Sequence, residues 1–188
     1  MFDYIIDKIK DTEFSEVFEN KVKYIELQNF FTQDHLKKLT NDVYNNKHLT
    51  MKDWPVDGTD PSLISFADMV DNDKTGFYEP MYDFFSSKEI KSAILKKFGL
   101  NKNIEEVQYR MSTSISFHTE YPQQIDYSHS DQKDNLFTIS LQIYLPQDDS
   151  LKDYGTLFHD SSGKEIYRTN FLSNTGYCFL ATNNSWHK

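Results

Sequence analysis

The chain has 188 residues, a length that favours a single domain with a sizeable hydrophobic core. Its 15 Phe and 12 Tyr argue against a disordered chain, and its net charge of −9 argues against general binding to nucleic acids or anionic membranes. The one cysteine, Cys178, excludes an internal disulfide and a cysteine-rich zinc site. We find neither a signal-peptide pattern nor an apolar stretch of membrane-spanning length, so we expect a cytoplasmic protein.

The first half of the sequence combines strand and helix patterns. Residues 23–29 alternate in polarity and predict a short strand. Thr32 is suited to cap a helix over residues 33–45. The apolar stripe of that helix would consist of Leu36, Leu39 and Val43. Residues 47–76 carry prolines, glycines and many aspartates, and they predict a long irregular segment.

A second helix is predicted over residues 87–98. Ser86 and Glu89 have the spacing of a capping box, and Gly99 is placed to end the helix. The apolar stripe consists of Ile90, Ala93, Ile94 and Phe98. Both predicted helices are too apolar on one face to be surrounded by water, so we expect them to pack on the outside of the β-structure that follows.

From about residue 106 the pattern changes to short strands separated by turns. Residues 137–145 alternate between apolar and polar types and predict the clearest strand of the chain. Another strand is predicted after Gly155, with a hairpin turn over 161–164 and a further turn over 174–176 before an apolar strand. This arrangement favours a β-sandwich or jelly roll, and together with the helices an α+β fold.

Three side chains have the types and spacing of an Fe(II) site. His129 and Asp131 are two positions apart, and residues i and i+2 of a strand point to the same side. His187 lies far along the chain and has to come from another strand. Two imidazoles and one carboxylate on one face leave three coordination positions for substrates and oxygen. His118 and Glu120 form a second pair with the same spacing, which we interpret as the end of a hairpin.

The stretch from His129 to His187 resembles the core of the Fe(II)- and 2-oxoglutarate-dependent dioxygenases, in particular the prolyl-4-hydroxylase-like branch. The matching pieces occur in order: the H-x-D motif at His129 and Asp131, a strand ending at Ile143–Tyr144–Leu145–Pro146, Gly-Thr-Leu at 155–157, a turn with Asn174 and Gly176, and Ser-Trp-His at 185–187. The resemblance implies a double-stranded β-helix (jelly roll) with flanking N-terminal helices. It implies one domain over residues 1–188, with a helix-rich part over 1–105 and the jelly-roll core over 106–188.

The resemblance also implies an enzyme that hydroxylates an unknown substrate while converting 2-oxoglutarate to succinate and CO2. His129, Asp131 and His187 would be the catalytic iron ligands. Tyr144 matches a position from which a tyrosine hydroxyl often reaches the 2-oxoglutarate carboxylate, and the polar face of its strand, which includes Ser140, would face the pocket. The expected partners are therefore the cosubstrate and a prime substrate, and neither nucleic acid nor a membrane.

The sequence departs from the family pattern at its C-terminal end. Family members anchor the distal carboxylate of 2-oxoglutarate with an Arg or Lys on the strand after the last histidine, and this sequence stops at Lys188. The resemblance therefore predicts that the last strand of the jelly roll is missing and that 2-oxoglutarate binds weakly. It also predicts an exposed strand edge at which copies of the chain could associate. The only arginines, Arg110 and Arg168, are the alternative anchors.

Other classes of function stay open. A cupin-like metal enzyme would use the same jelly roll, but it usually carries an H-x-H pair, which this sequence lacks. A non-catalytic β-sandwich that binds carbohydrate or protein would suit the aromatic content, and it would keep its ligand binding after a His129→Ala substitution. A zinc hydrolase is compatible with the ligand types, although no paired acid–base motif supports it.

Overall fold

The computed structural model describes residues 1–17, 22–45, 64–65, 76–101, 103–104, 114–115, 139–146, 148–180 and 187. Two compact units are present: the first contains Met1–Ile6 and Lys37–Pro122, and the second contains Asp7–Leu36 and Gln123–Lys188. Helices and antiparallel strands occur together, which confirms the α+β class. The predicted boundary between residues 105 and 106 lies outside the described residues.

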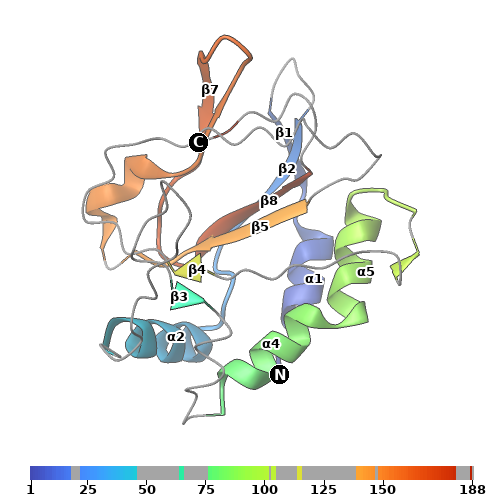
Figure 1. The fold of residues 1–188 in the computed structure, drawn as a ribbon, viewed down its shortest axis with the longest axis vertical. Helices are drawn as coiled ribbons and strands as arrows, with labels where there is room; N and C mark the ends of the chain where they lie inside the picture. Colours follow the sequence, from blue (N-terminus) through green and yellow to red (C-terminus); the bar gives the residue numbers. More distant parts are fainter. Residues whose placement is uncertain are drawn as a thin grey trace. The chain divides into compact units, whose positions relative to one another are not determined.

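The second unit contains a four-stranded antiparallel sheet in the order β1-β2-β8-β5 (Figure 1). The strands are β1 (Phe14–Val17), β2 (Val22–Leu27), β5 (Ile139–Tyr144) and β8 (Thr175–Leu180). Strands that we predicted near 23–29, within 137–145 and after 174–176 are thereby confirmed. The last of them begins at Thr175, so the turn before it lies at 173–174 and not at the predicted 174–176. The strand β1 was not predicted, because its four residues are too few to establish an alternating pattern.

A hairpin accompanies this sheet. It consists of β6 (Leu157–His159) and β7 (Glu165–Arg168), which pair antiparallel. Asp160 organises the turn, because its Oδ1 accepts hydrogen bonds from the backbone N–H groups of Ser162 (2.8 Å) and Lys164 (3.0 Å). Gly163 has a φ of 82°, a conformation that glycine adopts at little cost. The predicted turn over 161–164 is confirmed.

The two faces of the four-stranded sheet differ in composition. An aromatic cluster covers one face; its buried members are Val22, Tyr24, Tyr144, Phe158, Tyr177 and Phe179. Because Phe158 belongs to β6, the hairpin packs on this aromatic face. Alternation along the strands places Ile25, Leu27 and Cys178 on the opposite face, where all three are fully buried.

The helix α2 (Gln33–Asn45) has the predicted bounds. Thr32 caps it as predicted, since its Oγ1 accepts a hydrogen bond from the N–H of His35 at 3.3 Å. In the predicted apolar stripe, Leu39 is buried and Leu36 is half-buried. The side chain of Val43 lies outside the described residues.

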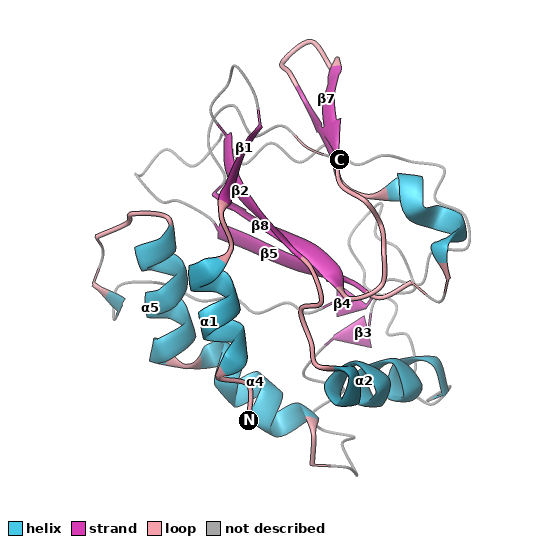
Figure 2. Ribbon diagram, turned by 180° about the vertical axis from the view of Figure 1, so that it is seen from behind, coloured by secondary structure: helices cyan, strands magenta, loops and turns pink. Residues whose placement is uncertain are grey.

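In the first unit, α4 (Tyr78–Ser86) is followed directly by α5 (Lys88–Lys97), as Figure 2 shows. The sequence did not reveal α4, because its aromatic residues and Pro80 obscure a helical period, although proline is tolerated in the first turn. Ser87 separates the helices and caps α5, with its Oγ accepting from the N–H of Ile90 at 3.4 Å. The predicted cap at Ser86 is therefore wrong by one residue.

Gly99 ends α5 as predicted. It has a φ of 69°, and the next N–H, that of Leu100, donates to the carbonyl of Leu95 at 2.9 Å. The buried residues of the helix are Ile90, Ala93 and Leu95. The predicted stripe members Ile94 and Phe98 are only half-buried, so the buried face is turned toward Leu95. That this helix covers a jelly roll stays a prediction.

The remaining described elements are short. They are α1 (Tyr4–Asp11), the two-residue strands β3 (Ile64–Ser65) and β4 (Ser114–Ile115), which pair antiparallel, and the 3-10 segment η3 (Asp149–Tyr154). Phe2, just before α1, packs against Phe77 and Phe84 with ring centroids 5.8 and 5.7 Å apart. No described helix is long and apolar enough to cross a membrane.

Candidate functional site

Three predicted site residues lie in the described part of the chain: Ser140, Tyr144 and His187. The other three, His129, Asp131 and Arg110, lie outside it, so their arrangement around a metal stays a prediction. Within the described ranges, no group of three or more His, Cys, Asp or Glu side chains could hold a metal ion.

His187 lies beside the hairpin. Its backbone forms an isolated antiparallel bridge with Phe158 of β6. Its half-buried ring meets the ring of Phe179 edge-on, with centroids 4.9 Å apart and planes at 74°, and lies 6.1 Å from that of Phe158. Both phenylalanines belong to the aromatic cluster that includes Tyr144. The predicted iron ligand and the predicted cosubstrate residue therefore share one face of the sheet.

Tyr144 ends β5, and its side chain is 8% exposed. The Tyr144 ring packs against Phe171 with centroids 4.8 Å apart. The pairing of β5 with β8 places Ser140 opposite Phe179, and alternation along β5 places Ser140 on the face that carries Tyr144. The predicted polar face of this strand thus coincides with the aromatic face of the sheet.

The hydroxyl of Tyr144 belongs to a connected set of five polar side chains, which we call the hydroxyl chain: Gln142, Tyr177, Thr156, Tyr144 and Thr169. Tyr177 donates to Gln142 Oε1 at 2.5 Å, and its hydroxyl lies 2.6 Å from that of Thr156. Tyr144 donates to Thr156 Oγ1 at 2.8 Å and lies 2.9 Å from Thr169 Oγ1. The N–H of Thr156 donates to the Tyr144 hydroxyl at 3.0 Å.

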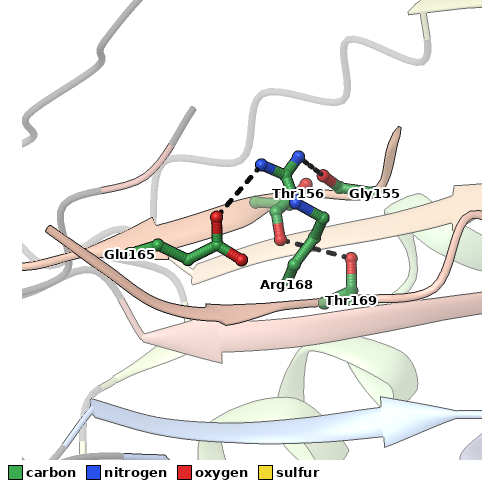
Figure 3. Close-up of polar contacts among 5 residues, drawn as sticks. All are labelled: Gly155, Thr156, Glu165, Arg168 and Thr169. Atoms are coloured by element: carbon green, nitrogen blue, oxygen red, sulfur yellow. Dashed lines mark hydrogen bonds and ion pairs between the residues drawn. The ribbon is translucent and has the colours of Figure 1, made fainter. Parts of the chain in front are cut away.

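The two threonines flank the hairpin, and the hydroxyl of Thr169 donates to the carbonyl of Thr156 at 3.5 Å (Figure 3). The N–H of Thr169 donates to the carbonyl of Thr156 at 3.0 Å. Gly155 permits this close approach, because a Cβ at its position would lie 2.0 Å from the carbonyl oxygen of Thr169. Gly155 therefore positions the threonine hydroxyls that surround Tyr144.

Burial strengthens the preference of both tyrosines of the hydroxyl chain for the protonated state. It raises the pKa of Tyr144, although hydrogen bonds with Thr156 and Thr169 act in the opposite direction. Burial raises the pKa of Tyr177 well above its ordinary value, and the neighbouring Tyr144 adds to this effect. Both hydroxyls are therefore neutral hydrogen-bond donors at physiological pH.

Arg168 has partners on the hairpin itself. One guanidinium nitrogen lies 3.4 Å from Glu165 Oε2 and the other donates to the carbonyl of Gly155 at 3.4 Å (Figure 3). A carboxylate bound by Arg168 would compete with Glu165 for this cation. Arg168 adjoins Thr169 in sequence, but its guanidinium is already engaged by Glu165 and Gly155 and is not a free anchor for a carboxylate.

Sequence reasoning missed three members of the hydroxyl chain, namely Tyr177, Thr156 and Thr169. Thr156 lies in the Gly-Thr-Leu stretch that carries the family resemblance, but nothing in the sequence pairs it with Thr169. A tyrosine inside an otherwise apolar strand, as at Tyr177, is the one signal that could have indicated a buried polar contact.

No protein-family model matches this chain, and neither a curated protein nor a solved structure is significantly similar to it.

Proposed function

We propose that this chain is an Fe(II)- and 2-oxoglutarate-dependent oxygenase that hydroxylates an unknown substrate and releases succinate and CO2. The observation that carries the proposal is the bridge between His187 and Phe158, which brings the last predicted iron ligand to the face that carries Tyr144. The family resemblance assigns both residues to one site, and the described geometry is consistent with that assignment.

The path of the chain supports a jelly roll. The strand β5 belongs to the four-stranded sheet, β6 and β7 form the hairpin over its aromatic face, and β8 returns to the sheet beside β5. The backbone at His187 then returns to β6. Alternation of successive strands between two facing sheets is typical of jelly rolls and double-stranded β-helices.

The surroundings of His187 are compatible with an iron ligand. The rings of Phe158 and Phe179 hold the imidazole at the border of an apolar cluster, and such surroundings orient a ligand and limit the access of water. His129 and Asp131 are proposed to complete the ligand set. Iron, when bound there, would supply the oxygen chemistry of the reaction.

Tyr144 is compatible with binding the carboxylate of 2-oxoglutarate, because its protonated hydroxyl can donate a strong hydrogen bond to an anion. Its single proton is donated to Thr156 in the described arrangement, so a bound carboxylate has to replace Thr156 as the acceptor. The neighbouring hydroxyl of Thr169 is a second donor, and Ser140 is on the same face. Arg110 remains the proposed cation for the distal carboxylate.

The test is an anaerobic titration of the protein with Fe(II) and 2-oxoglutarate, followed by the visible charge-transfer band of the complex. We expect the band in the wild-type chain and its loss in His187→Ala. His35→Ala, which removes a half-buried histidine from α2, is the matched control and should keep the band. Exposure to air should then yield succinate. Unchanged iron affinity in His187→Ala would exclude the proposed ligand, and a non-catalytic β-sandwich would give neither band nor succinate.

A further inference from the structure

Three hydrogen bonds hold Thr156 against the four-stranded sheet. Its N–H donates to the hydroxyl of Tyr144 at 3.0 Å, and its Oγ1 accepts the proton of that hydroxyl at 2.8 Å. Its Oγ1 also lies 2.6 Å from the hydroxyl of Tyr177, and Thr156 is the donor here because Tyr177 donates its proton to Gln142. Tyr144 belongs to β5 and Tyr177 to β8. The residue that leads into the hairpin is therefore bonded to two strands of the sheet.

The strand β6 extends this attachment to Phe158. It begins at Leu157, directly after Thr156. Thr156 and Phe158 are two positions apart, the spacing at which side chains of an extended segment share a face. Both contact the sheet: Thr156 through its hydrogen bonds, and Phe158 within the aromatic cluster, where its ring centroid lies 5.4 Å from that of Phe179. A polar and an apolar contact thus fix β6 relative to β8.

His187 depends on both β6 and β8 for its position. Its backbone bridges Phe158 of β6, whereas its ring meets that of Phe179 of β8 edge-on, with centroids 4.9 Å apart. A shift of β6 relative to β8 would therefore pull the backbone of His187 away from the contact that its ring makes. A metal ligand tolerates little such movement, because its ring has to be directed at the ion.

We propose that Tyr144 and Thr156 are positioning residues that hold the imidazole of His187 in place as an iron ligand by fixing β6 against the sheet. The inference rests on the proposed function, in which His187 binds the metal. It gives Tyr144 a role that needs no contact with the cosubstrate, since its proton is already donated to Thr156. Loss of either hydroxyl should then weaken iron binding even when 2-oxoglutarate is absent.

Two variants test this role. Tyr144→Phe removes both hydrogen bonds between the tyrosine hydroxyl and Thr156, and Thr156→Val removes both hydrogen bonds of Oγ1 to the tyrosines. We expect each variant to bind Fe(II) about tenfold more weakly in an anaerobic titration without 2-oxoglutarate, as for the loss of a group behind a metal ligand. Thr175→Val is the matched control and should keep the wild-type affinity. It removes from β8 a half-buried hydroxyl that donates to the carbonyl of Leu172 at 2.7 Å.

A role of Tyr144 at the cosubstrate alone predicts a different result. Thr156→Val would then release the Tyr144 proton for a carboxylate and leave the affinity for Fe(II) unchanged, while Tyr144→Phe would weaken only 2-oxoglutarate binding. A merely structural role would lower the melting temperature of both variants and leave the Fe(II) affinity of the folded protein unchanged. Wild-type affinity for Fe(II) in either variant therefore overturns the proposal.

Nuclear magnetic resonance tests the positioning in the metal-free protein. The ring protons of His187 should show Overhauser contacts with the ring of Phe179 in the wild type and in Thr175→Val. These contacts should weaken in Tyr144→Phe and in Thr156→Val, and unchanged contacts would overturn the proposal. If the contacts weaken but the wild type binds no Fe(II), the positioning of His187 stands and the proposed function fails.

Discussion

Asn174 links three segments of the second unit through both its backbone and its side chain. Its N–H donates to the carbonyl of Tyr144 (2.9 Å), and its carbonyl accepts from Phe30 (3.0 Å). Its side-chain amide both accepts from the N–H of Phe31 (2.7 Å) and donates to the carbonyl of Phe31 (2.8 Å). The φ of 61° is a left-handed conformation that asparagine tolerates better than most residues. The side-chain amide of Asn174 thus satisfies both backbone groups of Phe31, as a paired strand would in a sheet.

Asn174→Asp should destabilise the fold by about 1–3 kcal/mol, measured by urea denaturation. The carboxylate keeps the bond from the N–H of Phe31 but cannot donate to its carbonyl, which is left facing a negative charge. Asn29→Asp is the matched control, because Asn29 has a similar φ of 49° but an exposed side chain. Equal denaturation midpoints for both variants would contradict this role of Asn174.

Gly176 of β8 lies directly against the backbone of β5. A Cβ at this position would lie 2.0 Å from the carbonyl oxygen of Gln142 and 2.9 Å from the Cα of Ile143, both of which belong to the neighbouring strand. Gly176→Ala should therefore cost about 1–3 kcal/mol or more, because the strands have to move apart. Ser173→Ala, at an exposed position nearby, should change stability by less than about 0.5 kcal/mol. A midpoint for Gly176→Ala like that of Ser173→Ala would show that the strands adjust freely.

At the scale of elements, α5 shows how far periodicity alone defines a buried face. The sequence placed Ile94 and Phe98 in the apolar stripe, while the structure buries Leu95 beside Ile90 and Ala93. Leu95 also accepts the hydrogen bond that closes the C-terminal turn. Periodicity identified the helix, but several apolar residues in succession left the direction of its buried face to the packing.

We expect Leu95→Ala to cost about 2–5 kcal/mol, as for a large-to-small change in a core. Ile94→Ala in the same helix should cost less, since Ile94 is half-buried and Leu95 is 5% exposed. Thermal denaturation of the two variants measures the difference. The opposite order would support the face predicted from the sequence.

Elements were predictable where a few neighbouring residues decide the conformation. Thr32, Gly99 and the turn at 161–164 are of this kind, because caps and turns depend on local chemistry. The hydroxyl chain was not predictable in the same way. Tyr144 and Thr169 come from separate segments, and their contact depends on how the hairpin packs on the sheet. The family resemblance drew attention to Tyr144 but gave no indication of its partners.

At the scale of the whole molecule, buried tyrosine hydroxyls and a buried thiol make the stability of the fold decrease at alkaline pH. Burial raises the pKa values of Tyr24, Tyr144, Tyr177 and Cys178 above the values that these groups have in an unfolded chain. Above about pH 10 the unfolded tyrosines lose protons that the folded ones retain, so unfolding releases protons. The contribution of these groups to stability is complete below that pH and decreases as the pH rises; for Cys178 the decrease begins at about pH 9.

The free energy of unfolding of Tyr177→Phe should therefore decrease less steeply between pH 10 and 11 than that of the wild type. Removing the hydroxyl lowers stability at every pH, so the slope rather than the absolute value is diagnostic. Tyr154→Phe is the control, because Tyr154 is 74% exposed. Identical slopes for the wild type, Tyr177→Phe and Tyr154→Phe would exclude the linkage.

The ribosome makes β8 last among the four strands of this sheet, although β8 lies between β2 and β5. β2 is synthesised early and can pair with β1 at once, but its other neighbour is β8, where Tyr24 pairs with Phe179. Until β8 has been made, β2 exposes the backbone hydrogen-bonding groups of one edge. Pairings between segments so distant in sequence form slowly. During this interval a molecular chaperone or another unfolded chain can bind the exposed edge of the β1–β2 pair.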